Sequence, residues 1–401
     1  MRRSYLDRWF SEALEKNRTK ERDVLSPLGR ITVIIPSYER QDFLLRQMAY
    51  WGGEAASVVI VDGSRESLSG DILEALSTQP NIEYLHRPTD IASRLRVASG
   101  HIHTPYAVTL GDDEFHLKSG LSRAIEKLEI DHSLVACIGQ SLTFGPSRDG
   151  TFVRWGAGYS HWRYEVTQDD ARGRLISAMP NYNAATCYAV LREPFWSRSW
   201  GTLQRWSSPY AAELQQAIAT YVFGKLSTVD EVYWLRSSEN APISNRKESN
   251  RKLRFHDWWS LPLYESERQE FVAILAAEVV ASTRVGQGEA QSVIREGVEA
   301  YIQLGRRTST AMSPVASLTW WLRVLVGRAL KRVVSEELFL RLRASTVRLL
   351  RMQDEGNYGS LEDLIRLKSA GRLTMSSELL SELSDIETMI SGFYRARRGE
   401  T

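Results

Sequence analysis

The sequence of 401 residues contains only two cysteines, Cys137 and Cys187. Two thiols cannot form a disulfide framework or a structural zinc site, so both architectures are excluded. Both cysteines lie in apolar, strand-like stretches, where a free and buried thiol is expected. This scarcity favours a reducing, cytoplasmic setting.

Long apolar runs and excess charge are also missing. No stretch reaches the roughly 18 apolar residues of a membrane-spanning helix, and the charged residues 1–8 do not resemble a signal peptide. The formal net charge is only +2, which excludes a chain-wide basic surface for nucleic acid. We therefore expect a cytoplasmic protein with no nucleic-acid partner.

The composition is that of an ordinary globular protein, 43% hydrophobic and 25% charged, and the length favours more than one domain. The pattern of residues 1–29 predicts one helix followed by a connector. Residues 30–240 alternate short apolar runs with helical stretches. Residues 251–401, which follow a polar segment around Pro242, are almost wholly helical in pattern. We expect an N-terminal extension, an α/β domain and a C-terminal all-helical domain with these boundaries.

Short apolar runs rich in β-branched residues predict the strands of a sheet that is buried on both faces. They alternate with helical stretches, which is typical of βαβ units and a mostly parallel, Rossmann-like sheet with flanking helices. These runs are residues 31–35, 57–61, 82–85 and 106–110.

Polar clusters follow three of the predicted strands, at residues 36–40, 62–65 and 111–115. In open α/β sheets, ligands bind beyond the carboxyl ends of the strands. We therefore expect the three clusters to meet in one ligand site.

The third cluster contains three consecutive acids, Asp112, Asp113 and Glu114. Adjacent carboxylates repel one another and need a compensating cation. Oxygen ligands suit Mg²⁺ or Mn²⁺, which could bridge a diphosphate and offset its charge. The alternative interpretation is a solvated acidic turn.

Three motifs, taken in their order and spacing, resemble those of GT-A-fold glycosyltransferases of the family 2 kind. They are ITVIIPSYER (31–40), VVIVDGS (58–64) and TPYAVTLGDDEF (104–115). The third is similar to the metal motif of a bacterial subset in which three acids precede Phe. The resemblance covers about residues 30–240.

The resemblance implies a role for each motif residue. Asp62 would accept a hydrogen bond from the base, Arg94 would neutralise phosphate, and Asp112 would face the ribose or a metal-bound water. The family's usual pair of acids before Gly-Ser is reduced here to Asp62 alone. The residues that would border the nucleotide are Pro36, Ser37, Tyr38 and Arg40, and those that would hold Mn²⁺ or Mg²⁺ are Asp113 and Glu114.

An inverting transfer needs a carboxylate that takes the proton of the acceptor hydroxyl. The stretch that starts at Tyr210 resembles the region where the family places this base, which favours Glu213. The alternatives are that Glu213 only stabilises a helix N-terminus, and that Asp169 or Asp170 is the base.

Amide and aromatic side chains between residues 155 and 236 are candidates for the sugar sites. Asn183 would lie near the donor sugar, and Trp162 and Trp206 would face the acceptor, although large aromatics are also common in cores. Arg236 would close over the diphosphate or form a structural salt bridge.

Residues 318–351 form a basic, partly amphipathic stretch. Between Arg306 and Arg351 there are ten Lys or Arg and two Glu, a local charge of +8. Three interpretations stay open: an anionic membrane surface that carries a lipid-linked acceptor, the solvated face of a helical bundle, and a homodimer surface.

The sequence thus predicts a metal-dependent, inverting glycosyltransferase that moves a sugar from a nucleotide donor, UDP-sugar first, to a cell-surface glycan or lipid-linked acceptor. It would be cytoplasmic or peripheral at the inner face of the cell membrane. One rival is a sugar nucleotidyltransferase, but the loop 36–40 lacks the glycines of that class. The other is a degenerate domain that only binds partners as a scaffold.

Overall fold

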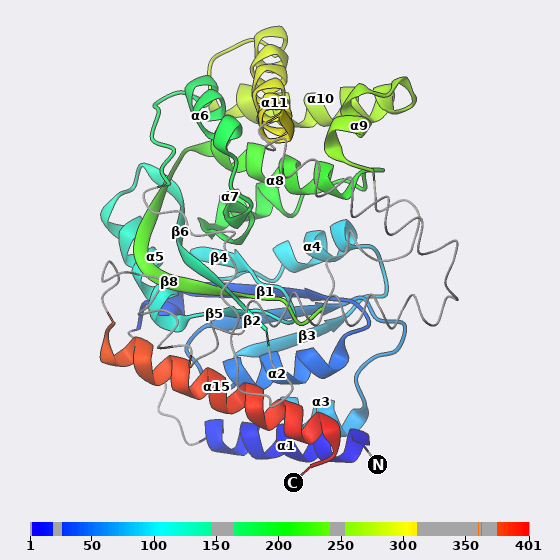
Figure 1. The fold of residues 1–401 in the computed structure, drawn as a ribbon, viewed down its shortest axis with the longest axis vertical. Helices are drawn as coiled ribbons and strands as arrows, with labels where there is room; N and C mark the ends of the chain where they lie inside the picture. Colours follow the sequence, from blue (N-terminus) through cyan, green and yellow to red (C-terminus); the bar gives the residue numbers. More distant parts are fainter. Residues whose placement is uncertain are drawn as a thin grey trace.

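The computed structural model describes residues 2–18, 26–145, 164–240, 253–310, 360, 362 and 375–400 (Figure 1). Within them, one eight-stranded sheet has the order β3-β2-β1-β4-β7-β6-β8-β5. Its strands are β1 (Ile31–Ser37), β2 (Ser57–Asp62), β3 (Ile82–His86), β4 (Tyr106–Thr109), β5 (Phe115–His116), β6 (Leu134–Phe144), β7 (Val190–Arg192) and β8 (Lys225–Ser237).

The half of the sheet that carries the three motifs is parallel. β1 pairs in parallel with β2 and with β4, and β2 pairs in parallel with β3. The apolar runs are buried as predicted, and the α/β class is confirmed. The other half is mixed, because β7 runs antiparallel to β4 and β6, and β5 runs antiparallel to β8.

Helices cover both faces of the sheet (Figure 1). α2 and α3 lie on one face with α1 and α15 outside them, and α4, α7 and α8 lie on the other. The α-helices are α1 (Arg2–Arg18), α2 (Gln41–Trp51), α3 (Gly70–Leu76), α4 (Ile91–Ser99), α5 (Lys118–Ile130), α6 (Ala171–Ala178), α7 (Glu193–Ser199), α8 (Pro209–Phe223), α9 (Phe255–Ser260), α10 (Glu265–Ser282), α11 (Gln287–Thr310) and α15 (Ser377–Arg398). Short 3-10 helices are η1 (Pro27–Arg30), η2 (Met179–Asn181), η3 (Ala184–Tyr188) and η6 (Pro262–Tyr264).

The described helices beyond residue 251 lie in two places. α10 and α11 pack on α8 and α6 at one end of the molecule, whereas α15 packs on α1, α2 and α5 at the other (Figure 1). None of the described helices is both long and apolar enough to cross a membrane. The basic stretch 318–351 lies outside the described residues.

Glu382 fixes α15 to the first turn of α5. Its Oε1 accepts hydrogen bonds from the Tyr50 hydroxyl at 2.7 Å and the Lys118 N–H at 2.5 Å. Its Oε2 accepts from the Ser119 N–H at 3.2 Å and the Ser119 hydroxyl at 2.9 Å. The N-cap residue of α5 is Leu117, which has no side-chain acceptor, so the cap comes from a residue more than 260 positions away.

We predict that Glu382→Gln lowers the free energy of unfolding by about 1–3 kcal/mol, because an amide group would face donors that need an acceptor. Urea unfolding measures this loss. Glu378→Gln, at an exposed position of the same helix, should stay within about 0.5 kcal/mol of the original. Equal stability of the two variants would mean that Glu382 does not cap α5.

Candidate functional site

The turns after β1 and β4 are in direct contact. The Ser37 hydroxyl donates to Asp112 Oδ2 at 2.7 Å. The Arg40 guanidinium lies 3.0 Å from Asp112 Oδ1 and 3.4 Å from Asp113 Oδ2, and most of its surface is buried. Burial alone lowers the pKa of Arg40, but the two carboxylates raise it above its ordinary value. Two of the three predicted clusters therefore form one charged site.

The turn after β2 joins this site through Gly63 and Arg94. Gly63 donates its N–H to the Ser37 carbonyl at 2.9 Å. The Arg94 guanidinium donates to the carbonyls of Ser37 and Val61, and a Cβ on Gly63 would lie 2.7 Å from it. Arg94 is therefore buried and engaged with the ends of β1 and β2. The expectation that Arg94 neutralises phosphate stays a prediction.

Asp62 shapes the turn between β2 and α3. Its Oδ1 accepts from the Ser64 N–H at 2.8 Å, and its Oδ2 accepts from the Tyr84 hydroxyl at 2.8 Å and the Gln41 amide at 3.2 Å. Its exposed fraction is 0%. Asp62 thus lies at the predicted strand end and holds the turn, and the expectation that it accepts a hydrogen bond from a base stays a prediction.

Glu39 has the left-handed backbone conformation, with φ of 55°. Such a conformation is unfavourable for a residue with a side chain and often occurs at functional sites. Its N–H donates to Ser64 Oγ at 2.8 Å, and its carboxylate accepts from the Arg65 N–H at 3.1 Å. These contacts join the turns after β1 and β2. Pro36 is partly buried beside them, and Tyr38 is 39% exposed.

The carboxylates of Asp112 and Asp113 have different partners. Burial raises the pKa of Asp112 to about 6, and Asp113 adds to the rise, whereas Arg40 and the Ser37 hydroxyl oppose it. Asp113 Oδ2 accepts from the Asn240 amide at 2.6 Å. The side chain of Asp113 keeps 11% of its surface exposed.

Glu114 has a different partner from the other two acids. Its Oε2 accepts from the Trp234 indole N–H at 3.1 Å. The side chain folds over the backbone of Gly111, where a Cβ would lie 2.7 Å from Oε2. Burial raises the pKa of Glu114 to about 8, and Asp113 contributes, against the effects of Trp234 and Arg236. Glu114, predicted as a metal ligand, is thus bonded to Trp234 in this structure, and its role toward a metal stays a prediction.

Two carboxylates suit a divalent ion that takes its other ligands from phosphate and water. No cluster of three or more His, Cys, Asp or Glu side chains in the described part of the chain could hold a metal by itself. Asp112 and Asp113 already hold one cation between them, the Arg40 guanidinium. The oxygens of Asp112 and Asp113 are therefore close enough together to share one positive charge.

Sequence reasoning missed two residues of α2 that hold the acidic turn. The Gln47 amide donates to the carbonyls of Asp112 at 3.2 Å and Glu114 at 2.5 Å. The Arg46 guanidinium donates to the carbonyl of Asp113 at 2.8 Å. All three consecutive carbonyls are therefore bonded. The only signal in the sequence is a pair of polar residues within an apolar helix.

Glu213 lies in the second turn of α8 and is partly buried. Its Oε1 accepts from the Tyr182 hydroxyl at 2.9 Å. Burial raises the pKa of Glu213, and Tyr182 and Arg236 oppose the rise. Arg236 also lowers the pKa of Glu114, so its charge acts on both acids. Glu213 therefore lies beyond the first turn of α8 and is no helix-capping acid.

The alternative bases lie elsewhere. Asp169 is almost fully exposed and pairs with Lys225 at 2.7 Å. Asp170 accepts from the Gly173 N–H at 2.7 Å and caps α6. Both carboxylates therefore have structural roles at the surface.

The predicted sugar-binding residues have different surroundings. Trp206, predicted to face the acceptor, is buried, donates to Gln215 at 2.8 Å, and packs against Trp258 and Phe271. Asn183 is buried and caps η3, with its amide nitrogen unbonded in the described part of the chain. Trp162 lies outside the described residues.

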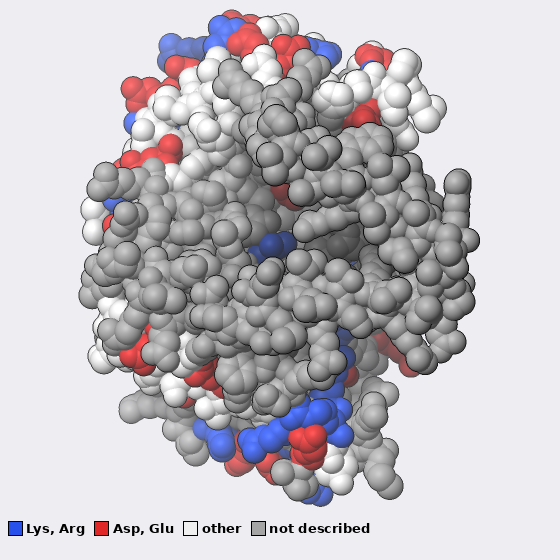
Figure 2. Space-filling view, viewed as in Figure 1, with Lys and Arg blue, Asp and Glu red and all other residues white. Residues whose placement is uncertain are grey.

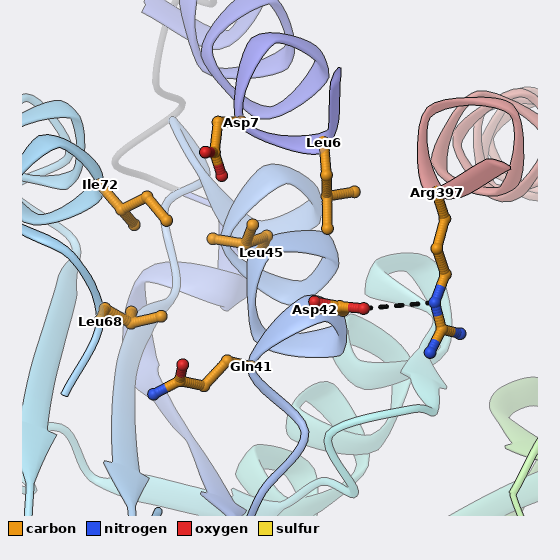
Figure 3. Close-up of a pocket in the computed structure, with 8 residues that line it drawn as sticks. All are labelled: Leu6, Asp7, Gln41, Asp42, Leu45, Leu68, Ile72 and Arg397. Atoms are coloured by element: carbon orange, nitrogen blue, oxygen red, sulfur yellow. Dashed lines mark ion pairs between the residues drawn. The ribbon is translucent and has the colours of Figure 1, made fainter. Parts of the chain in front are cut away.

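Figure 2 shows Lys or Arg atoms and a few Asp or Glu atoms near the middle of the face drawn there. A cavity of about 460 Å³ is lined by α1, α2, α3 and α15 (Figure 3). Its polar walls are engaged: Gln41 with Asp62 and the Glu66 carbonyl, and Asp42 with Arg397 at 3.2 Å. The lining residues are Leu6, Asp7, Gln41, Asp42, Leu45, Leu68, Ile72 and Arg397.

Comparison with known proteins gives distant structural likenesses only. No protein-family model and no curated protein matches the chain. Residues 1–349 of TarS from S. aureus have a TM-score of 0.39 at 14% identity, covering 70% of this chain and 91% of that one. The complex of this TarS fragment with UDP-GlcNAc has a TM-score of 0.39 at 12% identity, over 70% and 92%.

The mannosyltransferase PcManGT from Pyrobaculum calidifontis, in complex with GDP-Man and Mn²⁺, has a TM-score of 0.34 at 12% identity, over 80% of this chain and 88% of that one. At these scores, neither protein assigns an activity to this chain.

We predict that Gln47→Met lowers the free energy of unfolding by about 1–3 kcal/mol, because two buried carbonyls of the acidic turn lose their donor. Methionine has a similar volume, so packing should change little. Urea unfolding tests this. Gln204→Met, which removes only a local bond to the Thr202 carbonyl, is the control. Similar losses in both variants would contradict a special role of Gln47.

Proposed function

We propose that this chain is a nucleotide-sugar-dependent glycosyltransferase with a GT-A arrangement, whose donor diphosphate binds at the carboxyl ends of β1 and β4. One observation carries the proposal. Ser37 and Arg40, from the turn after β1, contact Asp112 and Asp113, from the turn after β4. Ligands of parallel α/β sheets bind at such an edge.

The charges of the site suit a diphosphate with a divalent ion. Asp112 and Asp113 would hold Mn²⁺ or Mg²⁺, and Arg40 lies beside them as a second positive charge. The ion would offset the charge of the departing nucleoside diphosphate. Ser37 and Pro36 border this position, and the exposed ring of Tyr38 is available to a nucleotide. Asp62 and Arg94 would act indirectly, by holding the ends of β1 and β2 in place.

Glu213 is the proposed general base of an inverting transfer. A base works best when its pKa approaches the working pH, and burial raises the pKa of Glu213 in that direction. Arg236, whose charge acts on Glu213 and on the acidic turn, would lie near the diphosphate. Asn183 has a buried amide that could donate to a donor-sugar hydroxyl.

We propose a UDP-sugar as donor, with a glycan or lipid-linked acceptor. Both assignments rest on the resemblance of the three motifs in residues 31–115. The test is release of nucleotide from UDP-, GDP- and dTDP-sugars with Mn²⁺ or Mg²⁺. Absence of any metal-dependent release, with and without glycan acceptors, would favour a protein that only binds.

Asp113→Ala should lower metal-dependent turnover by more than roughly 100-fold, because it removes a direct metal ligand, and outer-shell changes alone cost 10–100-fold. Glu114→Gln should keep its dependence on Mn²⁺ concentration, since its side chain faces Trp234 rather than the metal position. Titration of turnover with Mn²⁺ measures both. If Glu114→Gln shifts the Mn²⁺ dependence and Asp113→Ala does not, the metal assignment is wrong.

Glu213→Gln should lower kcat by roughly 10²- to 10⁴-fold, the usual contribution of a general base, and leave the KM of the donor nearly unchanged. Steady-state kinetics with varied donor measures the two constants. A large rise in donor KM with little change in kcat would instead give Glu213 a role in binding or folding.

The assignment of Glu213 as the base also predicts the direction in which the pH profile of kcat/KM shifts in a variant. The Tyr182 hydroxyl favours the charged carboxylate and so lowers the pKa of Glu213. Tyr182→Phe removes this bond, the pKa of Glu213 rises further, and the acid limb of kcat/KM should move to higher pH. A limb that stays in place or moves to lower pH would contradict Glu213 as the base.

A further inference from the structure

Arg46 of α2 is a fully buried cation below the acidic turn, with an exposed fraction of 0%. Its Nη1 and Nη2 donate to the two carboxylate oxygens of Glu239, each at 2.8 Å. Nη2 also donates to the carbonyl of Asp113 at 2.8 Å. The charge of Arg46 is thus neutralised by Glu239, which follows β8, and Nη2 also holds the proposed metal-binding turn.

The C-terminal helix α15 completes the surroundings of this ion pair. The ring of Phe393 lies over the Arg46 guanidinium at 5.1 Å, together with the rings of Phe43 and Phe115, each at 4.9 Å. The Tyr394 hydroxyl donates to Glu239 Oε1. Figure 1 shows α15 running beside α2 on the same side of the sheet.

Glu239 connects α15 to the side chain of Asp113. Its neighbour Asn240 donates from its amide to Asp113 Oδ2 at 2.6 Å. Ser237 holds the same segment, because its hydroxyl donates to Glu239 Oε2 at 2.9 Å and accepts from the Glu239 N–H at 3.0 Å. Asp113 thus accepts hydrogen bonds from both residues: its carbonyl accepts from Arg46 and its carboxylate accepts from Asn240.

A buried ion pair is a poor source of stability, since apolar residues of similar volume often serve as well. Its usual merit is a fixed geometry, because each charge must find its partner. Here the ion pair and its neighbour Asn240 hold both the backbone carbonyl and the side-chain carboxylate of Asp113. Outer-shell partners that orient ligating carboxylates typically affect metal affinity strongly.

We infer that α15 forms part of the proposed diphosphate site and that Tyr394 is a positioning residue, which acts on Asp113 through Glu239, Arg46 and Asn240. This inference rests on the proposed function. Tyr394 touches neither substrate nor metal; it supplies a hydrogen bond that fixes the carboxylate orientation of Glu239. The part of the chain that forms the site therefore extends to its last helix.

The test is Tyr394→Phe, which removes the hydroxyl and keeps the ring. Other contacts hold α15 in place, including Glu382 at α5 and the ion pair of Arg397 with Asp42 drawn in Figure 3. The variant should therefore fold. Binding of Mn²⁺ is measured by the loss of the free-ion EPR signal, in the presence of UDP and, separately, of GDP. We expect the apparent Mn²⁺ affinity to fall roughly tenfold.

Two controls separate positioning from general loosening. Tyr106→Phe removes another hydrogen bond from tyrosine to glutamate, donated to Glu129 at the amino-terminal end of β4. Glu382→Gln weakens the other end of α15. Both should bind Mn²⁺ as the original protein does, whatever their stability in urea.

The outcomes are distinct. If the original chain binds no Mn²⁺ with either nucleotide, the proposed function fails and the inference fails with it. If the original chain binds and Tyr394→Phe binds equally well, the proposed function stands and the positioning role is wrong. If Glu382→Gln loses as much affinity as Tyr394→Phe, the effect is general docking of α15, and the path through Glu239 is overturned.

Discussion

The crowding of three carboxyl groups in one buried turn is the constraint to which the rest of the site responds. Each acid of residues 112–114 is compensated differently. Asp112 has the Ser37 hydroxyl and the Arg40 guanidinium, Asp113 has Asn240 and a share of Arg40, and Glu114 has the Trp234 indole. The turn can exist in this form only because donors converge on it from several segments, and this convergence brings the strand ends together.

The backbone carbonyls of the turn have hydrogen-bond partners, as its side chains do. The carbonyls of the three acids would be costly to bury without donors, and α2 supplies these donors through Arg46 and Gln47. A guanidinium at that depth needs its own counter-charge, which Glu239 provides. Glu239 in turn brings Tyr394 of α15 into the arrangement. Charge compensation thus extends, step by step, from the turn to the last helix.

The strand ends could be predicted from sequence because they follow from local patterns. The β-branched runs at 31–35 and 57–61 mark buried parallel strands, and the turns after parallel strands must meet at one edge. Arg46 and Gln47 could not be predicted, since adjacent polar residues in a helix usually face solvent. Trp206 had no local signal that separates a core ring from a sugar-binding one. The bond from Tyr394 to Glu239 spans 155 positions, which no periodicity reveals.

The acids near the site differ in chemistry because their neighbours differ. Asp112 and Asp113 share the Arg40 cation, whereas Glu114 is buried against an indole and a glycine backbone. Glu213 lies on another element, where burial raises its pKa and a tyrosine hydroxyl restrains the rise. Arg236 acts electrostatically on both Glu114 and Glu213. The same charge thus lowers the pKa of one acid in the turn after β4 and of one acid on α8.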